Sequence, residues 1–236
     1  MKRALVVALG MLTLAALPAA AADLPARMPT KAPVMVAPAW SWSGFYIGVN
    51  GGYGWSRSEH VDTAGVSSGR FNQNGGLIGG TVGYNWQMGG AVLGLEGDFD
   101  WARINGSTNC GGATTCFTEM RNFSTVRGRL GWANGNWMPY LTGGLALANI
   151  RAGQNFPGVQ ASDTWRAGWT IGGGLEVMFA PGWSAKAEYL YADFGSSAAS
   201  YNGLPLNVNV SERNVNIIRG GINYHFDMGG PVVARY

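Results

Sequence analysis

The sequence predicts an all-β chain, an eight-stranded antiparallel up-and-down transmembrane β-barrel with long extracellular loops and short periplasmic turns. Three observations favour this fold class. Only 12% of the 236 residues are charged, about half the share of a soluble domain, whereas 38 are glycine and 12% aromatic. No apolar run of about 18 residues follows the N-terminal segment, so membrane-spanning helices are not expected. Long stretches alternate between apolar and small or polar residues, as strands do.

The N-terminal segment, residues 1–22, has the pattern of a cleaved signal peptide. Lys2 and Arg3 precede an apolar run that ends at Pro18, and small residues then lead to Ala22. This order predicts export and cleavage between Ala22 and Asp23. The formal net charge is only +3 and includes two positive charges from this segment, so nucleic acid is not an expected partner.

Two shorter segments flank the predicted barrel, which occupies residues 42–226. Residues 23–41 contain four prolines, which fix φ and remove amide donors, so this stretch is expected to be an extended periplasmic leader. Residues 227–236 are expected to be a periplasmic C-terminal tail.

The first four strands are predicted at residues 44–57, 75–88, 91–103 and 119–133. Residues 91–103 are divided in this way, with Leu93, Leu95 and other large apolar residues on one parity and three acids on the other. Alternate acids backed by apolar residues suit a strand between lipid and a polar lumen. Tryptophans near strand ends, including Trp42, Trp55 and Trp101, fit interfacial girdles.

The last four strands are predicted at residues 137–149, 164–179, 183–194 and 212–226. Connections alternate between long ones, such as 58–74, and short ones that contain Gly-Gly, Asn-Gly or Pro-Gly. Short periplasmic turns and long extracellular loops are typical of outer-membrane barrels, and an even strand number places both barrel ends in the periplasm. Each strand exceeds the length of about 9–11 residues that a tilted strand needs to cross the hydrocarbon.

Charged residues on the inward parity are predicted to form a lattice inside the barrel. An eight-stranded barrel is just wide enough for side chains to fill, and unpaired buried charges are costly. The acids of the third strand are therefore expected to pair with the arginines of the adjacent fourth strand and to plug the lumen. The alternative is a narrow path for ions or small solutes. The predicted lattice consists of Glu96, Asp98, Asp100, Arg121, Arg127, Arg129, Arg166, Glu176, Lys186, Glu188 and Arg219.

The two cysteines and two histidines give no catalytic or metal-binding pattern. Cys110 and Cys116 lie in one predicted extracellular loop, where an exported chain favours a disulfide. His60 is expected in the first extracellular loop with Asp62, far from His225 at the periplasmic end. Because no Gly-x-Ser-x-Gly motif is present either, we expect no enzyme, no catalytic residue, no cofactor and no metal.

Several stretches resemble alphaproteobacterial outer-membrane β-barrel proteins, the porin-family proteins of the rhizobial RopB-like and brucella-type immunogenic kind. The resemblance covers residues 41–226 and is carried by WSGFYIGVNGGYGW from Trp42, TVRGRLG from Thr125, PYLTGGLA from Pro139 and AEYLYADFG from Ala187. The last strand is similar to the signal that the barrel assembly machinery reads, at Arg219, Gly221, Tyr224 and Phe226. Many such barrels end at that phenylalanine, whereas this chain continues to Tyr236.

The resemblance and the pattern together predict a structural, surface-exposed protein of the cell outer membrane that supports envelope integrity. Its partners would be outer-membrane lipid, lipopolysaccharide and, during biogenesis, the assembly machinery. A narrow porin and a loop-mediated adhesin are the other hypotheses. The sequence names no receptor or solute, and it leaves open whether the barrel forms a homo-oligomer.

Overall fold

The computed structural model describes residues 40–62, 67–109, 115–155, 162–200 and 207–226. The predicted signal peptide with its cleavage site at Ala22 and Asp23, nearly all of the leader and the C-terminal tail lie outside these residues. Within the described ranges, no helix has the length and hydropathy to cross a bilayer.

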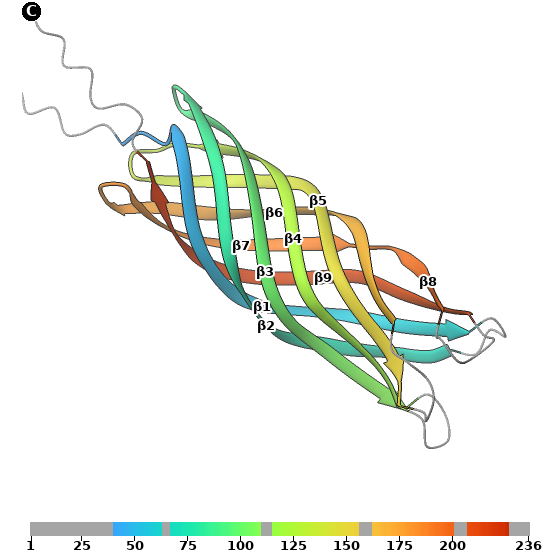
Figure 1. The fold of residues 1–236 in the computed structure, drawn as a ribbon. Coiled ribbons are helices and arrows are strands. Elements are labelled where there is room, and N and C mark those ends of the chain that lie inside the picture. Colours follow the sequence, from blue (N-terminus) through green and yellow to red (C-terminus); the bar gives the residue numbers. More distant parts are fainter. Residues whose placement is uncertain (1–39, 63–66, 110–114, 156–161, 201–206, 227–236) are drawn as a thin grey trace, which may run out of the picture. The chain divides into compact units, whose positions relative to one another are not determined.

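Within these ranges the chain forms nine strands in a single antiparallel sheet. The sheet closes into a ring because β1 pairs with β9, from Tyr46 opposite His225 to Asp62 opposite Val208 (Figure 1). The strands are β1 (Gly44–Asp62), β2 (Ser67–Met88), β3 (Ala91–Asn109), β4 (Thr115–Trp132), β5 (Trp137–Gln154), β6 (Ser162–Ala180), β7 (Trp183–Asp193), β8 (Ser196–Ser200) and β9 (Asn207–His225).

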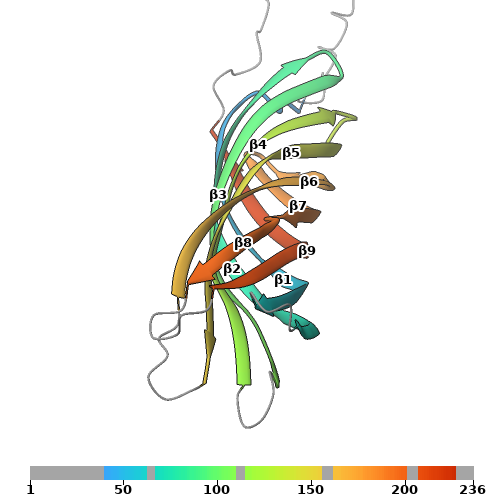
Figure 2. The same cartoon turned by 90° about the vertical axis from the view of Figure 1, so that its right-hand side faces the viewer.

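The strands β7 and β8 share one position in the ring. Both pair with β9, β7 along residues 215–224 and β8 along residues 207–211. The strand is interrupted between Asp193 and Ser196, where Gly195 has a φ of +67°, a conformation that suits glycine. The fold is therefore an antiparallel ring of eight strands, as the sequence predicts. Figure 2 shows β7, β9 and β1 side by side in this ring.

The strands run well beyond the predicted ends at the loop side. Residues 58–74 were expected to form a loop, but β1 continues to Asp62 and β2 begins at Ser67, with Arg57 opposite Asn72. His60 and Asp62 consequently belong to β1 and not to a loop. Outward residues need to be apolar only where they face lipid. Where the paired strands continue into water, the apolar alternation is no longer required, so the sequence does not indicate that they continue.

Large apolar side chains cover the outer face of the ring. Alternate residues of β3 point outward, with Leu95 57% and Trp101 63% exposed, and the same holds for Trp165, Trp169 and Ile171 of β6. Trp42 is an exception to the predicted girdles, because its side chain is fully buried at the turn end of the barrel. It precedes β1 on the same parity as the inward-facing Tyr46, which explains its direction.

The interior consists of two apolar layers with charged residues between them. At the turn end, Trp42, Val92, Met138, Tyr140 and Met178 form one cluster. Nearer the loop end, a larger cluster includes Ile104, Phe123, Ile150, Phe194 and Ile217. On β3, the buried acids Glu96, Asp98 and Asp100 come between Val92 of the first cluster and Ala102 of the second.

Candidate functional site in the barrel lumen

The inner face of β3 supplies three acids to the lumen. Glu96, Asp98 and Asp100 alternate with outward-facing apolar residues, and their exposed fractions are 1%, 7% and 0%. Successive residues of a strand face opposite sides of the sheet. The alternation that gives the barrel an apolar outer surface therefore also places these three carboxylates in one row on the inner face.

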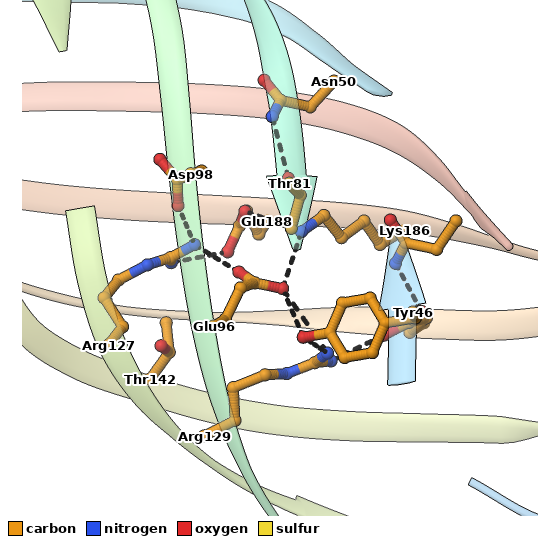
Figure 3. Close-up of polar contacts among 12 residues, drawn as sticks. Tyr46, Asn50, Thr81, Glu96, Asp98, Arg127, Arg129, Thr142, Lys186 and Glu188 are labelled. Carbon is orange, nitrogen blue, oxygen red and sulfur yellow. Dashed lines mark hydrogen bonds and ion pairs between the residues drawn. The ribbon is translucent and has the colours of Figure 1, made fainter. Parts of the chain in front are cut away.

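Arg127 of β4 binds carboxylates from two different strands. Its Nη2 contacts Glu96 and lies 2.9 Å from Asp98 Oδ2, while its Nη1 lies 2.9 Å from Glu188 Oε2 of β7 (Figure 3). Thr125, two residues earlier on the same face, donates from Oγ1 to Asp98 Oδ2 at 2.6 Å. Charge-assisted bonds of this kind compensate the cost of burying the ions.

Arg219 of β9 bonds across the lumen to the same group of acids. Its Nη1 lies 2.8 Å from Asp100 Oδ2, its Nη2 lies 2.9 Å from Asp98 Oδ2, and its Nε lies 2.6 Å from Glu188 Oε1. Lys186 of β7 adds a bond from Nζ to Glu96 Oε2 at 2.9 Å. Pairing therefore extends across the lumen as well as along the wall between β3 and β4.

A second group lies closer to the turns, around Arg129. Its Nη2 lies 2.6 Å from Glu176 Oε2 and its Nη1 donates to the Tyr46 hydroxyl at 2.9 Å. The Tyr46 hydroxyl in turn donates to Glu96 Oε2 at 2.8 Å and joins the two groups (Figure 3). The guanidinium also stacks on the ring of Tyr140, 4.0 Å from its centroid. The two groups together pair four cations with five acids, namely Arg127, Arg129, Lys186 and Arg219 with Glu96, Asp98, Asp100, Glu176 and Glu188.

Ser184, His225 and Glu176 form a buried polar cluster beside Arg129. Ser184 Oγ lies 2.9 Å from His225 Nε2 and donates to Glu176 Oε1 at 2.5 Å, and Nε2 lies 3.3 Å from that same oxygen. A catalytic triad needs the acid on the second ring nitrogen, but Nδ1 has no partner here. Trp42 contacts the His225 ring edge-on, with centroids 5.9 Å apart, so the cluster is a packed structural element.

Two predicted members of the lattice occupy different places. Arg121 is directed away from the lumen, since its side chain is 41% exposed and pairs with Glu119 at 3.3 Å. The reason is a bulge, because the ladder between β4 and β5 shifts between Met120 and Asn122 and reverses the parity of the preceding residues. Arg166 is buried on the inner face of β6, opposite Ala148 and level with the larger apolar cluster.

Several interior residues are not among the predicted site residues. Tyr46, Ser184 and Asn223, whose Nδ2 donates to Glu176 Oε1 at 2.7 Å, are uncharged and were not considered, although each has the inward parity. The larger apolar cluster was not predicted either, because the inward face was expected to be polar. Parity alone could have identified both sets.

The remaining predicted sites stay predictions. Cys116 is buried at the start of β4 and is disulfide-bonded, while Cys110 lies outside the described residues. Of the assembly-signal residues, Tyr224 and Phe226 point outward, and the Phe226 amide donates to the Phe45 carbonyl at 2.8 Å. In the described part of the chain, no group of three or more His, Cys, Asp or Glu side chains could hold a metal ion.

Comparisons with known proteins agree with this architecture. A family model described as an outer membrane protein β-barrel domain matches residues 7–226. The 31 kDa outer-membrane immunogenic protein of Brucella melitensis is 37% identical over 84% of this chain and 88% of its own length. A 22 kDa outer membrane protein of Rhizobium leguminosarum is 30% identical over 68% of each chain.

Among solved structures, the outer membrane protease OmpT of Escherichia coli is similar in fold. It matches with a TM-score of 0.51 and 9% identity, over 78% of this chain and 97% of its own. At that identity the likeness concerns the fold alone.

Proposed function

The chain belongs to the outer-membrane β-barrel family that includes the immunogenic proteins of Brucella, and from this premise we propose that it is a closed structural barrel. It is a protein of the cell outer membrane. Its proposed role is to support envelope integrity and to present its loops at the cell surface, with the lumen plugged.

One observation carries the proposal, namely the burial of the charged residues that would line a channel. The exposed fractions of Glu96 and Arg127 are 1% each, and that of Asp100 is 0%. Side chains along a water-filled path would be accessible from at least one mouth, whereas these lie between two apolar clusters. A barrel of eight strands leaves little room for water once its side chains are packed.

A non-enzymatic role fits the same arrangement. The relatives that match are named as immunogenic or outer membrane proteins, and the cluster of Ser184 and His225 is buried and lacks triad geometry. We therefore infer that the barrel interior stabilises the fold and does not perform catalysis.

Single-channel conductance tests the closed state directly. The refolded, signal-cleaved protein would be added to planar bilayers at two salt concentrations, with a 16-stranded porin as positive control. We expect no defined current steps, while a heat-dependent change in gel mobility shows that the protein is folded. Steps that scale with salt would contradict the proposal and favour the narrow porin.

A deletion strain tests the role in the envelope. Loss of the gene should increase sensitivity to detergents and bile salts, and the wild-type gene should restore resistance. Unchanged sensitivity would argue against a part in envelope integrity, whatever the conductance experiment shows.

A further inference from the structure

The outer face of β9, β1, β2 and β3 carries two surface hollows. The first, which we call the rim hollow, has a volume of about 490 Å³ and is lined by Tyr53, Trp55, Arg57, Asn72, Asn74 and Asn216, among others. The second, the wall hollow, has a volume of about 580 Å³ and is lined by Val49, Gly51, Ile78, Trp101, Gly220 and Ile222, among others. The rim hollow is polar and the wall hollow is apolar.

The two hollows lie in one line along the strands. Outward residues of β1 pass from Val49 and Gly51 in the wall hollow to Tyr53, Trp55 and Arg57 in the rim hollow. The neighbouring strands follow the same order, because β9 runs from residue 222 to 214 and β2 from 78 to 72 alongside β1. The line thus begins in the apolar band and ends near the loops.

Local backbone features produce both hollows. In the wall hollow Gly51 and Gly220 are register partners, so two neighbouring positions lack side chains between larger apolar residues. At the rim, the ladder between β1 and β9 shifts between Trp55 and Arg57, and Asn214 has a φ of 61°. Such a bulge opens the strand pair locally and redirects side chains.

The rim hollow offers positive charge and fixed amide groups. Arg57 faces outward and, among the side chains that the structure describes, forms no ion pair and shares the hollow with no carboxylate. Asn74 donates to the Tyr53 hydroxyl at 2.5 Å, and Asn216 accepts from the Tyr189 hydroxyl at 2.6 Å. Oriented amides beside aromatic rings suit sugar hydroxyls and ring faces, and the guanidinium suits a phosphate.

We propose that this line of hollows binds one phosphorylated glycolipid of the outer leaflet. An acyl chain would lie along the wall hollow, and the phosphorylated sugar would occupy the rim hollow with its phosphate at Arg57. The inference rests on the predicted orientation of the barrel, with its loop end extracellular, and is independent of whether the lumen conducts. The ligand class is lipid A, the membrane-embedded part of lipopolysaccharide.

Native mass spectrometry of the mature protein in detergent, titrated with purified bis-phosphorylated lipid A, tests the site. The variant Gly51→Leu fills the wall hollow without backbone strain, because a Cβ there would meet only the Leu77 carbonyl oxygen at 3.7 Å. Its control is Gly128→Leu, an outward glycine of β4 whose Cβ would be 3.9 Å from its nearest neighbour. We expect about tenfold weaker lipid A binding for Gly51→Leu only.

The head-group contact is tested with Arg57→Gln against Arg121→Gln, which removes the same charge on β4. An arginine near an anionic lipid head group contributes about 1 kcal/mol, which corresponds to about fivefold in affinity. We expect this loss for Arg57→Gln alone, and a similar loss when the wild type is given dephosphorylated lipid A.

Each other outcome overturns part or all of the proposal. Equal effects of Gly51→Leu and Gly128→Leu on lipid A binding would mean that lipid A contacts the barrel only as part of the surrounding lipid and not at a specific site. Equal binding of phosphatidylglycerol, with the same dependence on the variants, would exclude a glycolipid site. Gel mobility verifies that every variant folds, and conductance is read separately, so failure here leaves the closed barrel untouched.

Discussion

Arg127 shows how one side chain connects distant parts of the chain. Its guanidinium contacts Glu96 and Asp98 on β3 and Glu188 on β7, and its side chain is fully buried. Removing one member of a buried ion network leaves the others as uncompensated charges, which is far more costly than the network is stabilising. The lattice is therefore a group of mutually dependent residues.

The substitution Arg127→Met should destabilise the barrel by about 3–5 kcal/mol, because three carboxylates lose a cation in a buried site. The measurement is the free energy of unfolding in urea, followed by tryptophan emission in detergent. Arg121→Met is the matched control, since the ion pair with Glu119 is partly exposed and contributes about 0–1 kcal/mol. Equal losses for the two variants would contradict the buried lattice.

Inward glycines of β5 and β6 explain how bulky side chains fit inside a narrow ring. A Cβ at Gly144 would lie 2.2 Å from the Val126 carbonyl oxygen, while one at Gly143 would find its nearest neighbour at 3.5 Å. These two residues are adjacent but face opposite sides of the wall. The inward position, Gly144, therefore has no room for a side chain, whereas the outward position, Gly143, does.

The pair Gly144→Ala and Gly143→Ala turns this difference into a measurement. Gly144→Ala should cost about 1–3 kcal/mol, because the backbone of β4 must move to relieve the contact. Gly143→Ala should stay within about 0.5 kcal/mol of the wild type. Urea unfolding gives both values, and an equal loss would mean that strand propensity decides the outcome and not the close approach.

Alternation of side chains was predictable element by element, but changes of parity were not. The outward apolar row of β6 and the inward acids of β3 follow directly from the sequence, since lipid demands an apolar surface. The outward position of Arg121 depends on a bulge in β4. That bulge arises from the pairing of β4 with both β3 and β5, which the sequence of β4 alone does not reveal. The strand extensions beyond residue 57 escaped prediction because polar strands in water lose the apolar alternation.

At the scale of the whole molecule, pairing across the lumen depends on how the ring closes. The sequence suggested that acids of β3 pair with the adjacent β4, and Arg127 does so. The contact of Arg219 with Asp98 joins residues 121 positions apart and depends on the register between β1 and β9. Registers of distant strands cannot be inferred from local patterns, so this half of the lattice required the structure.

The distribution of tryptophans predicts a spectroscopic result for the intact protein. Eight tryptophans point outward and are at least 40% exposed, whereas Trp42 is fully buried in the lumen. In vesicles of brominated lipid, which quench emission on contact, a small unquenched fraction should remain. Trp42→Phe should lower that fraction, while Trp169→Phe, an outward control, should not. Complete quenching in the wild type would contradict the inward position of Trp42.

The hydrogen bond from the Phe226 amide to the Phe45 carbonyl places the two ends of the barrel chain side by side. A short linker could therefore join them, and the chain could be opened instead at the Gly89-Gly90 turn to give a circularly permuted barrel with the same ladders. In that molecule the residues from Arg219 to Phe226 would be intact but no longer near the C-terminus. Such a permutant separates the chemical identity of the predicted assembly signal from its position, which no point substitution can do.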